Sequence, residues 1–159
     1  MKPNQLSEHF TLTEMTQTST GIDNSAPWEI VPNGRSLCGE LLEPLRALLE
    51  SPLQILSGFR TPEVNSAVGG SHSSDHLSFL AADFRPTKQT IQSAWYKIVD
   101  HRLTLSFKQA IIYPTRDFIH ISLDLRSSPK RELLVSWTSG SYEPFRPFTP
   151  IGGSHVGIS

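Results

Sequence analysis

The sequence predicts an α+β fold, with a small central antiparallel sheet and helices packed on one side of it. Leucines recur at helical spacing over residues 35–50, and apolar residues do so again over 91–101. Two short apolar runs at 110–113 and 118–122 are separated only by the segment PTRD, which is typical of a β-hairpin. Amphipathic helices together with an antiparallel hairpin indicate the α+β class.

The first half of the chain predicts one helical turn, one helix and one strand. Residues 1–34 are polar and turn-rich, with a short helical turn expected after Thr11 or Thr13, either of which can cap it. The helix over 35–50 contains Pro44, which removes a helix hydrogen bond and predicts a kink or a split. A strand is expected at 53–57, directly after Pro52. The Gly- and Ser-rich residues 66–78 predict a loop.

The second half predicts a short strand at 80–84, a helix over 91–101 capped by Thr90, the hairpin, and an edge strand at 133–135. From residue 138 onward Gly, Ser, Thr and Pro dominate, which is typical of a flexible tail. We hypothesise instead that this tail packs on its own domain or on a partner chain. The predicted organisation is a domain over 1–124 and a C-terminal extension over 125–159.

Composition excludes several classes of protein. Fourteen Lys and Arg residues against 15 Asp and Glu residues leave a net charge of −1, so no basic excess favours nucleic acid. Cys38 is the single cysteine, which excludes an internal disulfide and a four-cysteine zinc site. No run approaches the roughly 20 apolar residues of a membrane span. The opening MKPNQLSEHF has no apolar core, so we expect no signal peptide and synthesis in the cytoplasm.

Four residues are candidates for metal chemistry. His76, Asp83 and His120 offer two imidazoles and one carboxylate, a ligand set typical of catalytic zinc. Asp117 precedes His120 by three residues and could serve as a proton acceptor that is not a ligand. Spacing alone leaves open a second interpretation, in which these histidines are hydrogen-bonded residues of the sheet.

A resemblance to a known family bears on this choice. Residues 74–83 (SDHLSFLAAD) resemble the Ser-x-His-x-x-Gly-x-Ala-x-Asp signature of the zinc D-Ala-D-Ala peptidases, metallopeptidase family fifteen. Five further segments are similar to the family, in the family's order: 6–10 (LSEHF), 42–46, 57–60, 65–71 and 117–122 (DFIHIS). The resemblance covers roughly residues 6–123 and implies a fold like that of hedgehog domains and D-Ala-D-Ala peptidases.

The resemblance implies a role for each matching residue. The zinc ligands would be His76, Asp83 and His120, and the acid/base would be Asp117. Arg60 would polarise the substrate carbonyl or steady the oxyanion. Three residues of the loop that leads to His76 are expected to contact substrate or to support the zinc ligands: His72, Ser74 and Asp75. Phe79 departs from the family's glycine, and we expect it to distort the loop or fill the cleft.

The implied function is zinc-dependent hydrolysis of peptidoglycan stem peptides or cross-links. Peptidoglycan lies outside the cytoplasmic membrane, so a chain without an export signal suggests a bacteriophage or prophage endolysin-like enzyme. Release by a holin, or delivery by a virion, would bring it to the wall. The alternative is a weakly active or inactive virion protein on the same scaffold, whose tail binds neighbouring subunits. No nucleic acid and no membrane insertion are expected.

Overall fold

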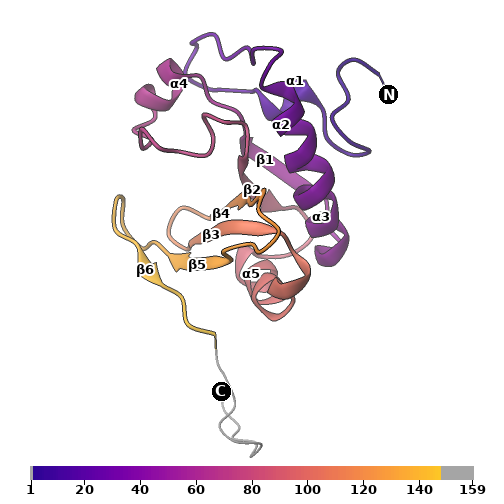
Figure 1. Cartoon of the computed structure of the whole chain (residues 1–159). Helices are drawn as coiled ribbons and strands as arrows, with labels where there is room; N and C mark the ends of the chain where they lie inside the picture. The colour runs from indigo at the N-terminus through magenta and orange to yellow at the C-terminus, as the bar shows by residue number, and fades with distance from the viewer. Residues whose placement is uncertain (1, 148–159) are drawn as a thin grey trace, which may run out of the picture.

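Six strands form one sheet in the computed structural model, which describes residues 2–147 (Figure 1). Their order across the sheet is β1-β2-β4-β3-β5-β6. The strands are β1 Leu53–Ser57, β2 Ala81–Pro86, β3 Phe107–Tyr113, β4 Phe118–Leu123, β5 Glu132–Val135 and β6 Glu143–Pro144. All neighbouring strands are antiparallel except β3 and β5, which are parallel. The predicted α+β class and hairpin are confirmed. The prediction of an antiparallel sheet is wrong for one pair of strands, β3 and β5.

Two short helices were not expected from the sequence. The helices of the structure are α1 Leu12–Met15, α2 Val31–Ser36, η1 Leu37–Leu42, α3 Glu43–Leu49, α4 Pro62–Ala67, α5 Ile91–Asp100 and η2 Arg102–Thr104. Thr11 and Thr90 cap α1 and α5, each accepting a backbone N–H with its hydroxyl, as predicted. The unexpected helices are η2 and α4, and in α4 Thr61 is the cap and Pro62 occupies the first turn.

A proline explains the shape of the longest helical segment, in which α2, η1 and α3 follow one another without a break. Pro44 has no N–H, and in a regular α-helix its ring would clash with the carbonyl group four residues earlier. The chain avoids this by widening into the π-helical segment η1, at whose end the Glu43 N–H bonds to the Cys38 carbonyl oxygen. The helix predicted over 35–50 is confirmed, and η1 is its predicted irregularity.

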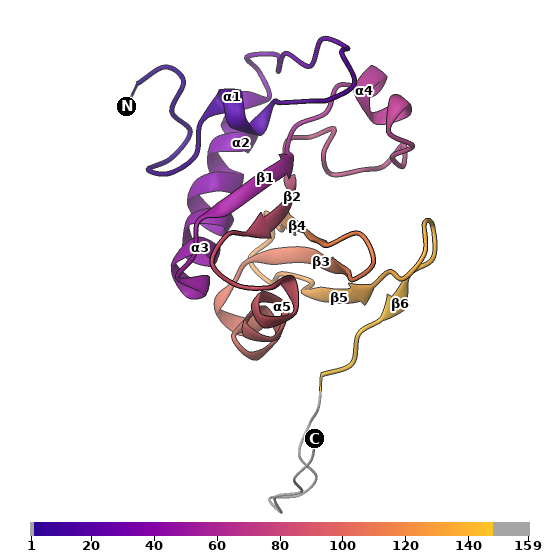
Figure 2. The ribbon, with the colours of Figure 1, turned by 180° about the vertical axis from the view of Figure 1, so that it is seen from behind.

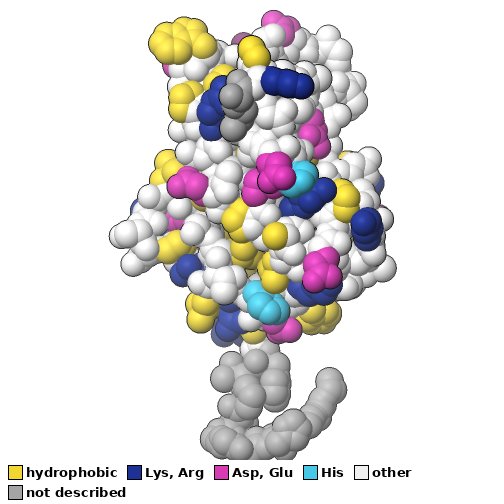
Figure 3. Space-filling model, turned by 90° about the vertical axis from the view of Figure 1, so that its right-hand side faces the viewer, with side chains coloured by type: hydrophobic (Ala, Val, Ile, Leu, Met, Phe, Trp, Pro, Cys, Tyr) yellow, Lys and Arg dark blue, Asp and Glu magenta, His cyan; other side chains and the backbone are white. Residues whose placement is uncertain are grey.

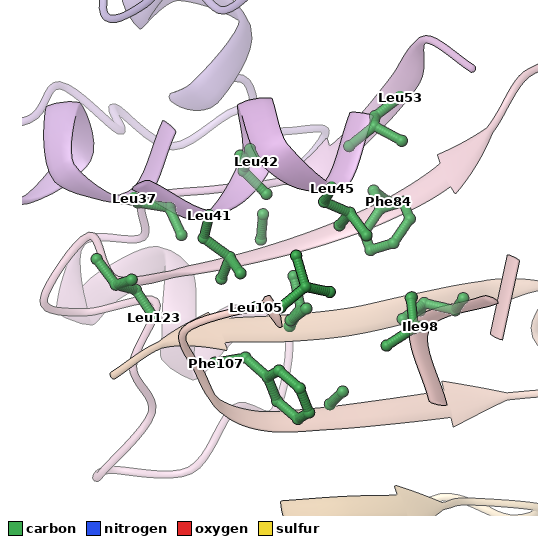
Figure 4. Packing of buried hydrophobic residues seen from close by; sticks show 14 of the residues in the cluster. Leu37, Leu41, Leu42, Leu45, Leu53, Phe84, Ile98, Leu105, Phe107 and Leu123 are labelled. Carbon is green, nitrogen blue, oxygen red and sulfur yellow. The ribbon is translucent and has the colours of Figure 1, made fainter. Parts of the chain in front are cut away.

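The hydrophobic core lies between this helical segment, α5 and one face of the sheet. Figure 4 shows leucines of the helix directed toward side chains of β2, β3 and α5, among them Leu41, Leu45, Phe84, Ile98 and Phe107. Because strand side chains alternate between faces, Ile119 and Ile121 of β4 reach this core and His120 points the other way. The long helical segment and α5 therefore cover one face of the sheet, and the opposite face is left open.

The C-terminal part of the described chain belongs to the same sheet. The predicted strand at 133–135 is β5, but it lies inside the sheet because β6 pairs with its outer edge. Both strands fall within the predicted extension, and their hairpin lies on the same side of the molecule as α4 (Figures 1 and 2). The rest of the predicted tail, over 148–159, lies outside the described residues.

Two observations concern the surface. On the face shown in Figure 3, basic and acidic side chains are interspersed among apolar ones, without a block of one sign. Among residues 2–147, no helix combines the length and the apolar character that crossing a membrane requires.

A hydrogen-bonded clamp joins the N-terminal segment to α3. Ser7 Oγ and the His9 N–H both donate to Glu43 Oε1, at 2.6 and 2.7 Å, and His9 Nδ1 lies 2.8 Å from Oε2. Burial tends to raise the pKa of Glu43, but these hydrogen bonds outweigh it and hold the pKa below its ordinary value. The ionised carboxylate is therefore the form that the fold stabilises.

Glu43→Gln is expected to lower the free energy of unfolding by about 1–2 kcal/mol at neutral pH, because charge-assisted hydrogen bonds are lost. Since the folded-state pKa lies below the unfolded one, this contribution is complete above the unfolded pKa. It is lost as pH falls through the folded pKa. Urea unfolding of both proteins between about pH 7 and pH 3 measures the difference. A difference that stays constant over this range would contradict the role of the ionised carboxylate.

Candidate metal centre

The open face of the sheet holds a cavity of about 550 Å³. Its floor is formed by β2, β3 and β4. One wall is the loop that follows α4, and the opposite wall is the hairpin between β5 and β6. These two walls lie on the same side of the molecule in both ribbon views (Figures 1 and 2). The long helical segment and α5 are on the other face, so the cavity is built on the sheet without interrupting the core.

The structure brings three predicted residues together in this cavity. His76 comes from the loop, and Asp83 and His120 come from paired positions on β2 and β4. One potential ligand atom from each lies within 4.8 Å of the others. Asp83 Oδ1 is 3.2 Å from His76 Nε2 and 2.9 Å from His120 Nδ1. Two ligands about 2.0–2.1 Å from a tetrahedral zinc ion would themselves be roughly 3.4 Å apart, close to these values.

The hydrogen bonding of His76 fits a metal at this point. Its Nδ1 lies 2.6 Å from the carbonyl oxygen of Gly58, which can only accept, so Nδ1 carries a proton. Burial lowers the pKa of His76, which favours the neutral ring. Nε2 faces Asp83 Oδ1, so without a metal this contact needs a second proton on the ring, which burial disfavours. A cation between the two atoms would take the place of that proton, and a backbone carbonyl on the far nitrogen is typical of a zinc-binding histidine.

Arg60 holds the other oxygen of the same carboxylate. Its Nη2 donates to Asp83 Oδ2 at 3.1 Å, and the guanidinium is also bonded to Ser57 and Asn65. Burial works to raise the pKa of Asp83, but the two histidines outweigh it, and the pKa lies far below its ordinary value. Asp83 is therefore an ionised group whose Oδ1 is directed at both imidazoles. Arg60 lines the cavity, as its predicted role requires, and in this state it orients a candidate ligand.

The loop that carries His76 is fixed at several points. The Arg60 N–H donates to the His76 carbonyl oxygen at 3.0 Å, and Ser74 Oγ accepts from the His76 N–H at 3.2 Å. Asp75 forms an ion pair with Lys108 of β3 at 3.0 Å. Ser74 and Asp75 line the cavity, in keeping with support or substrate contact, whereas His72 is exposed and does not line it.

Asp117 lies apart from these residues. It occupies the turn between β3 and β4 with a φ of 57°, and its side chain is 66% exposed and outside the cavity lining. Arg85 binds it twice, with Nε 2.6 Å from the backbone oxygen and 3.3 Å from Oδ2. The structure therefore does not bring the Asp117 carboxylate to the three candidate ligands, and its acid/base role stays a prediction.

Phe79 occupies the core and not the cleft. Its side chain is fully buried, 5.5 Å from the Phe59 ring centroid, and is absent from the cavity lining. The expectation that it fills the cleft is wrong. Its φ of 60° lies in the left-handed region, which explains why glycine suits this position. The ring fits because Gly34 of α2 has no side chain: a Cβ there would lie 2.6 Å from it.

Sequence reasoning missed an aromatic and cationic group on the cavity wall. Its members are Tyr113, Arg116, Phe118 and Tyr142. Strand alternation could have indicated Tyr113 and Phe118, because these two residues are paired across the hairpin and lie on the same face of the sheet as His120. Nothing in the composition of the C-terminal segment could have indicated Tyr142, which reaches the cavity only because β5 and β6 fold back onto the sheet.

Comparison with protein families supports this interpretation of the site. A family model described as Peptidase M15 matches residues 7–122, which contain all three candidate ligands, Arg60 and Asp117. No curated protein matches the chain.

Proposed function

The chain belongs to the peptidase M15 family, and from this premise we propose that it is a zinc-dependent enzyme that hydrolyses peptidoglycan stem peptides or cross-links. The observation that carries the proposal is the set of His76, Asp83 and His120 at the floor of an open cavity. His76 Nε2 and His120 Nδ1 both face Asp83 Oδ1, at distances that a zinc ion bound by all three side chains would also give. Two imidazoles and one carboxylate leave a coordination position for the reaction, as in catalytic zinc sites.

The proposed activity needs residues that hold zinc and residues that orient these ligands. Zinc held by the three side chains would supply a Lewis acid and an activated water. Gly58 and Arg60 fix the orientation of His76 and Asp83, so these ligands do not need to reorganise. Lys108 holds Asp75, and with it the loop that bears His76. The substrate peptide would lie in the cavity between this loop and the β5–β6 hairpin.

Asp117 is the proposed acid/base, and its exposed turn makes this role testable. Proton transfer to the leaving amine requires the carboxylate to leave Arg85 and turn toward His120. Asp117→Ala is expected to lower the peptidase rate about 10²–10⁴-fold, the usual contribution of a positioned acid/base. Arg85→Gln, which frees the same carboxylate, is expected to retain activity.

The experiment is digestion of purified peptidoglycan with added zinc, with released peptides identified by mass spectrometry. Wild type, Asp117→Ala and Arg85→Gln are compared at equal zinc content. Absence of peptide release by the wild type would contradict the peptidase proposal. Equal release by wild type and Asp117→Ala would contradict only the role of Asp117.

One observation favours the enzyme over the structural alternative. A closed site, or Phe79 in the cleft, would favour the structural alternative, but Phe79 is buried in the core and the cavity is open. We propose a bacteriophage or prophage lysis enzyme as the setting, with delivery to the wall by a holin or a virion. This setting rests on the wall-degrading activity that the family resemblance implies.

A further inference from the structure

Arg116 is a cation on the cavity wall with an unusual environment. Its guanidinium carbon lies 5.4 Å from the ring centroid of Tyr113 and 5.2 Å from that of Phe118. These two rings are stacked, with centroids 4.3 Å apart. Among residues 2–147 no carboxylate forms an ion pair with Arg116. The rings hold the guanidinium in place by cation–π contact while its donor groups remain free.

The charges of the cavity support a role for this cation. The lining contains three cations and two carboxylates, and two of the cations are already neutralised. Arg60 is paired with Asp83 at 3.1 Å, and Lys108 with Asp75 at 3.0 Å. Only the charge of Arg116 is left without an opposite charge. A cavity of this kind favours an anionic ligand group, and a planar guanidinium matches a carboxylate with two parallel hydrogen bonds.

Tyr142 lines the same cavity as Arg116, and both side chains contact the Tyr113 ring. The Tyr142 ring meets that of Tyr113 edge-on, with ring centroids 6.5 Å apart. Tyr142 is half exposed and lies beyond residues 7–122, so it belongs to this chain's own C-terminal hairpin and not to the family-matched region. Thr115 Oγ1 donates to the Trp137 carbonyl oxygen at 2.9 Å, which ties the turn bearing Arg116 to this hairpin.

We propose that Arg116 and Tyr142 form a subsite that binds a carboxylate of the peptide substrate and thereby selects acidic peptides. The proposal rests on the proposed peptidase function, because it uses the same cavity. The stacked rings of Tyr113 and Phe118 provide the rigid base, and the hydrogen bond between turn and hairpin keeps the two parts together. Pre-organisation of this kind lowers the entropic cost of ordering side chains on binding.

The test measures binding, independently of cleavage. The probe is a synthetic peptidoglycan stem tripeptide, used with its carboxylates free and with them amidated, and titrated calorimetrically into the zinc-loaded protein at low salt. Wild type is expected to bind the free peptide about 10-fold more tightly than the amidated one, because a charge-assisted pair is lost on amidation. Arg116→Gln is expected to weaken binding of the free peptide about 10-fold and to leave the amidated peptide unchanged.

Two further variants refine the test. Tyr142→Phe, which removes only the hydroxyl group, is expected to weaken binding of the free peptide about threefold. Lys97→Gln is the matched control, because it removes one exposed positive charge from α5, on the opposite face of the sheet, and is expected to change nothing.

The outcomes separate this inference from the proposed function. Equal binding of the free and amidated peptides by wild type, or equal binding of the free peptide by wild type and Arg116→Gln, would overturn the subsite. If peptidoglycan is still cleaved in that case, the peptidase function stands. A carboxylate preference that depends on Arg116, without any cleavage of peptidoglycan, would support the subsite and overturn the peptidase.

Discussion

His120→Ala is expected to abolish zinc binding and, with it, peptidase activity. The substitution removes one of three candidate ligands and leaves the pairs of Asp83 with Arg60 and with His76 intact, so the fold is retained. Loss of a residue that only supports a ligand typically lowers metal affinity 10–100-fold. Loss of the ligand itself should therefore cost more than about 100-fold. Competition with a chromogenic chelator measures the affinity.

Thermal unfolding provides a second readout that needs no substrate. A ligand that binds only the folded state at about 100 times its dissociation constant adds about 2.7 kcal/mol of stability. For a chain of this size that corresponds to a rise of roughly 5–10 °C in the unfolding midpoint. Wild type is expected to show this rise with zinc and to lose it with a chelator, whereas His120→Ala shows neither.

His72→Ala is the matched control, because His72 belongs to the same loop as His76 but is exposed and outside the cavity lining. It is expected to bind zinc as wild type does. Stoichiometric zinc on His120→Ala, or loss of zinc from His72→Ala, would contradict the assignment of the three ligands.

The three candidate ligands could be named from the sequence, but spacing alone left a structural interpretation open, and the resemblance of residues 74–83 and 117–122 to the zinc peptidases favoured the metal site. The motif around His76 and Asp83 lies in one loop and the strand after it, and His120 alternates with core isoleucines on β4. Each position is determined by near neighbours in the chain and by strand periodicity. The same reasoning predicted the strands of the hairpin and the cap of α5.

Other features depend on contacts between distant segments, which periodicity does not encode. The parallel pairing of β3 with β5 places Tyr142 on the cavity wall, although composition around it is typical of a tail. Asp117 is the opposite case. The family resemblance predicts its role, but its left-handed backbone and its ion pair with Arg85 determine where its side chain points. The short helix α4 was missed because Gly and Ser dominate the stretch directly after it.

Phe79→Ala is expected to lower the free energy of unfolding by about 3–5 kcal/mol. The ring is fully buried beside Phe59, and its removal leaves a cavity in addition to the lost burial. The alanine variant keeps the backbone φ of 60°, and any residue with a Cβ is destabilised by about 1–2 kcal/mol in this left-handed region. Phe79→Gly removes this strain because glycine has no Cβ. Glycine is therefore expected to be less destabilising than alanine here, the reverse of the usual order, and urea unfolding can compare the two.

Gly34 provides the internal control for this explanation. A Cβ at residue 34 would lie 2.6 Å from the Phe79 ring, so Gly34→Ala alone is expected to destabilise the protein through overpacking. In a Phe79→Gly background the ring is gone, and the same substitution should stabilise, because alanine favours the helix by about 1 kcal/mol over glycine. The double-mutant cycle thus predicts a change of sign. Additive effects of the two substitutions would show that the ring and Gly34 do not share the space the structure assigns to them.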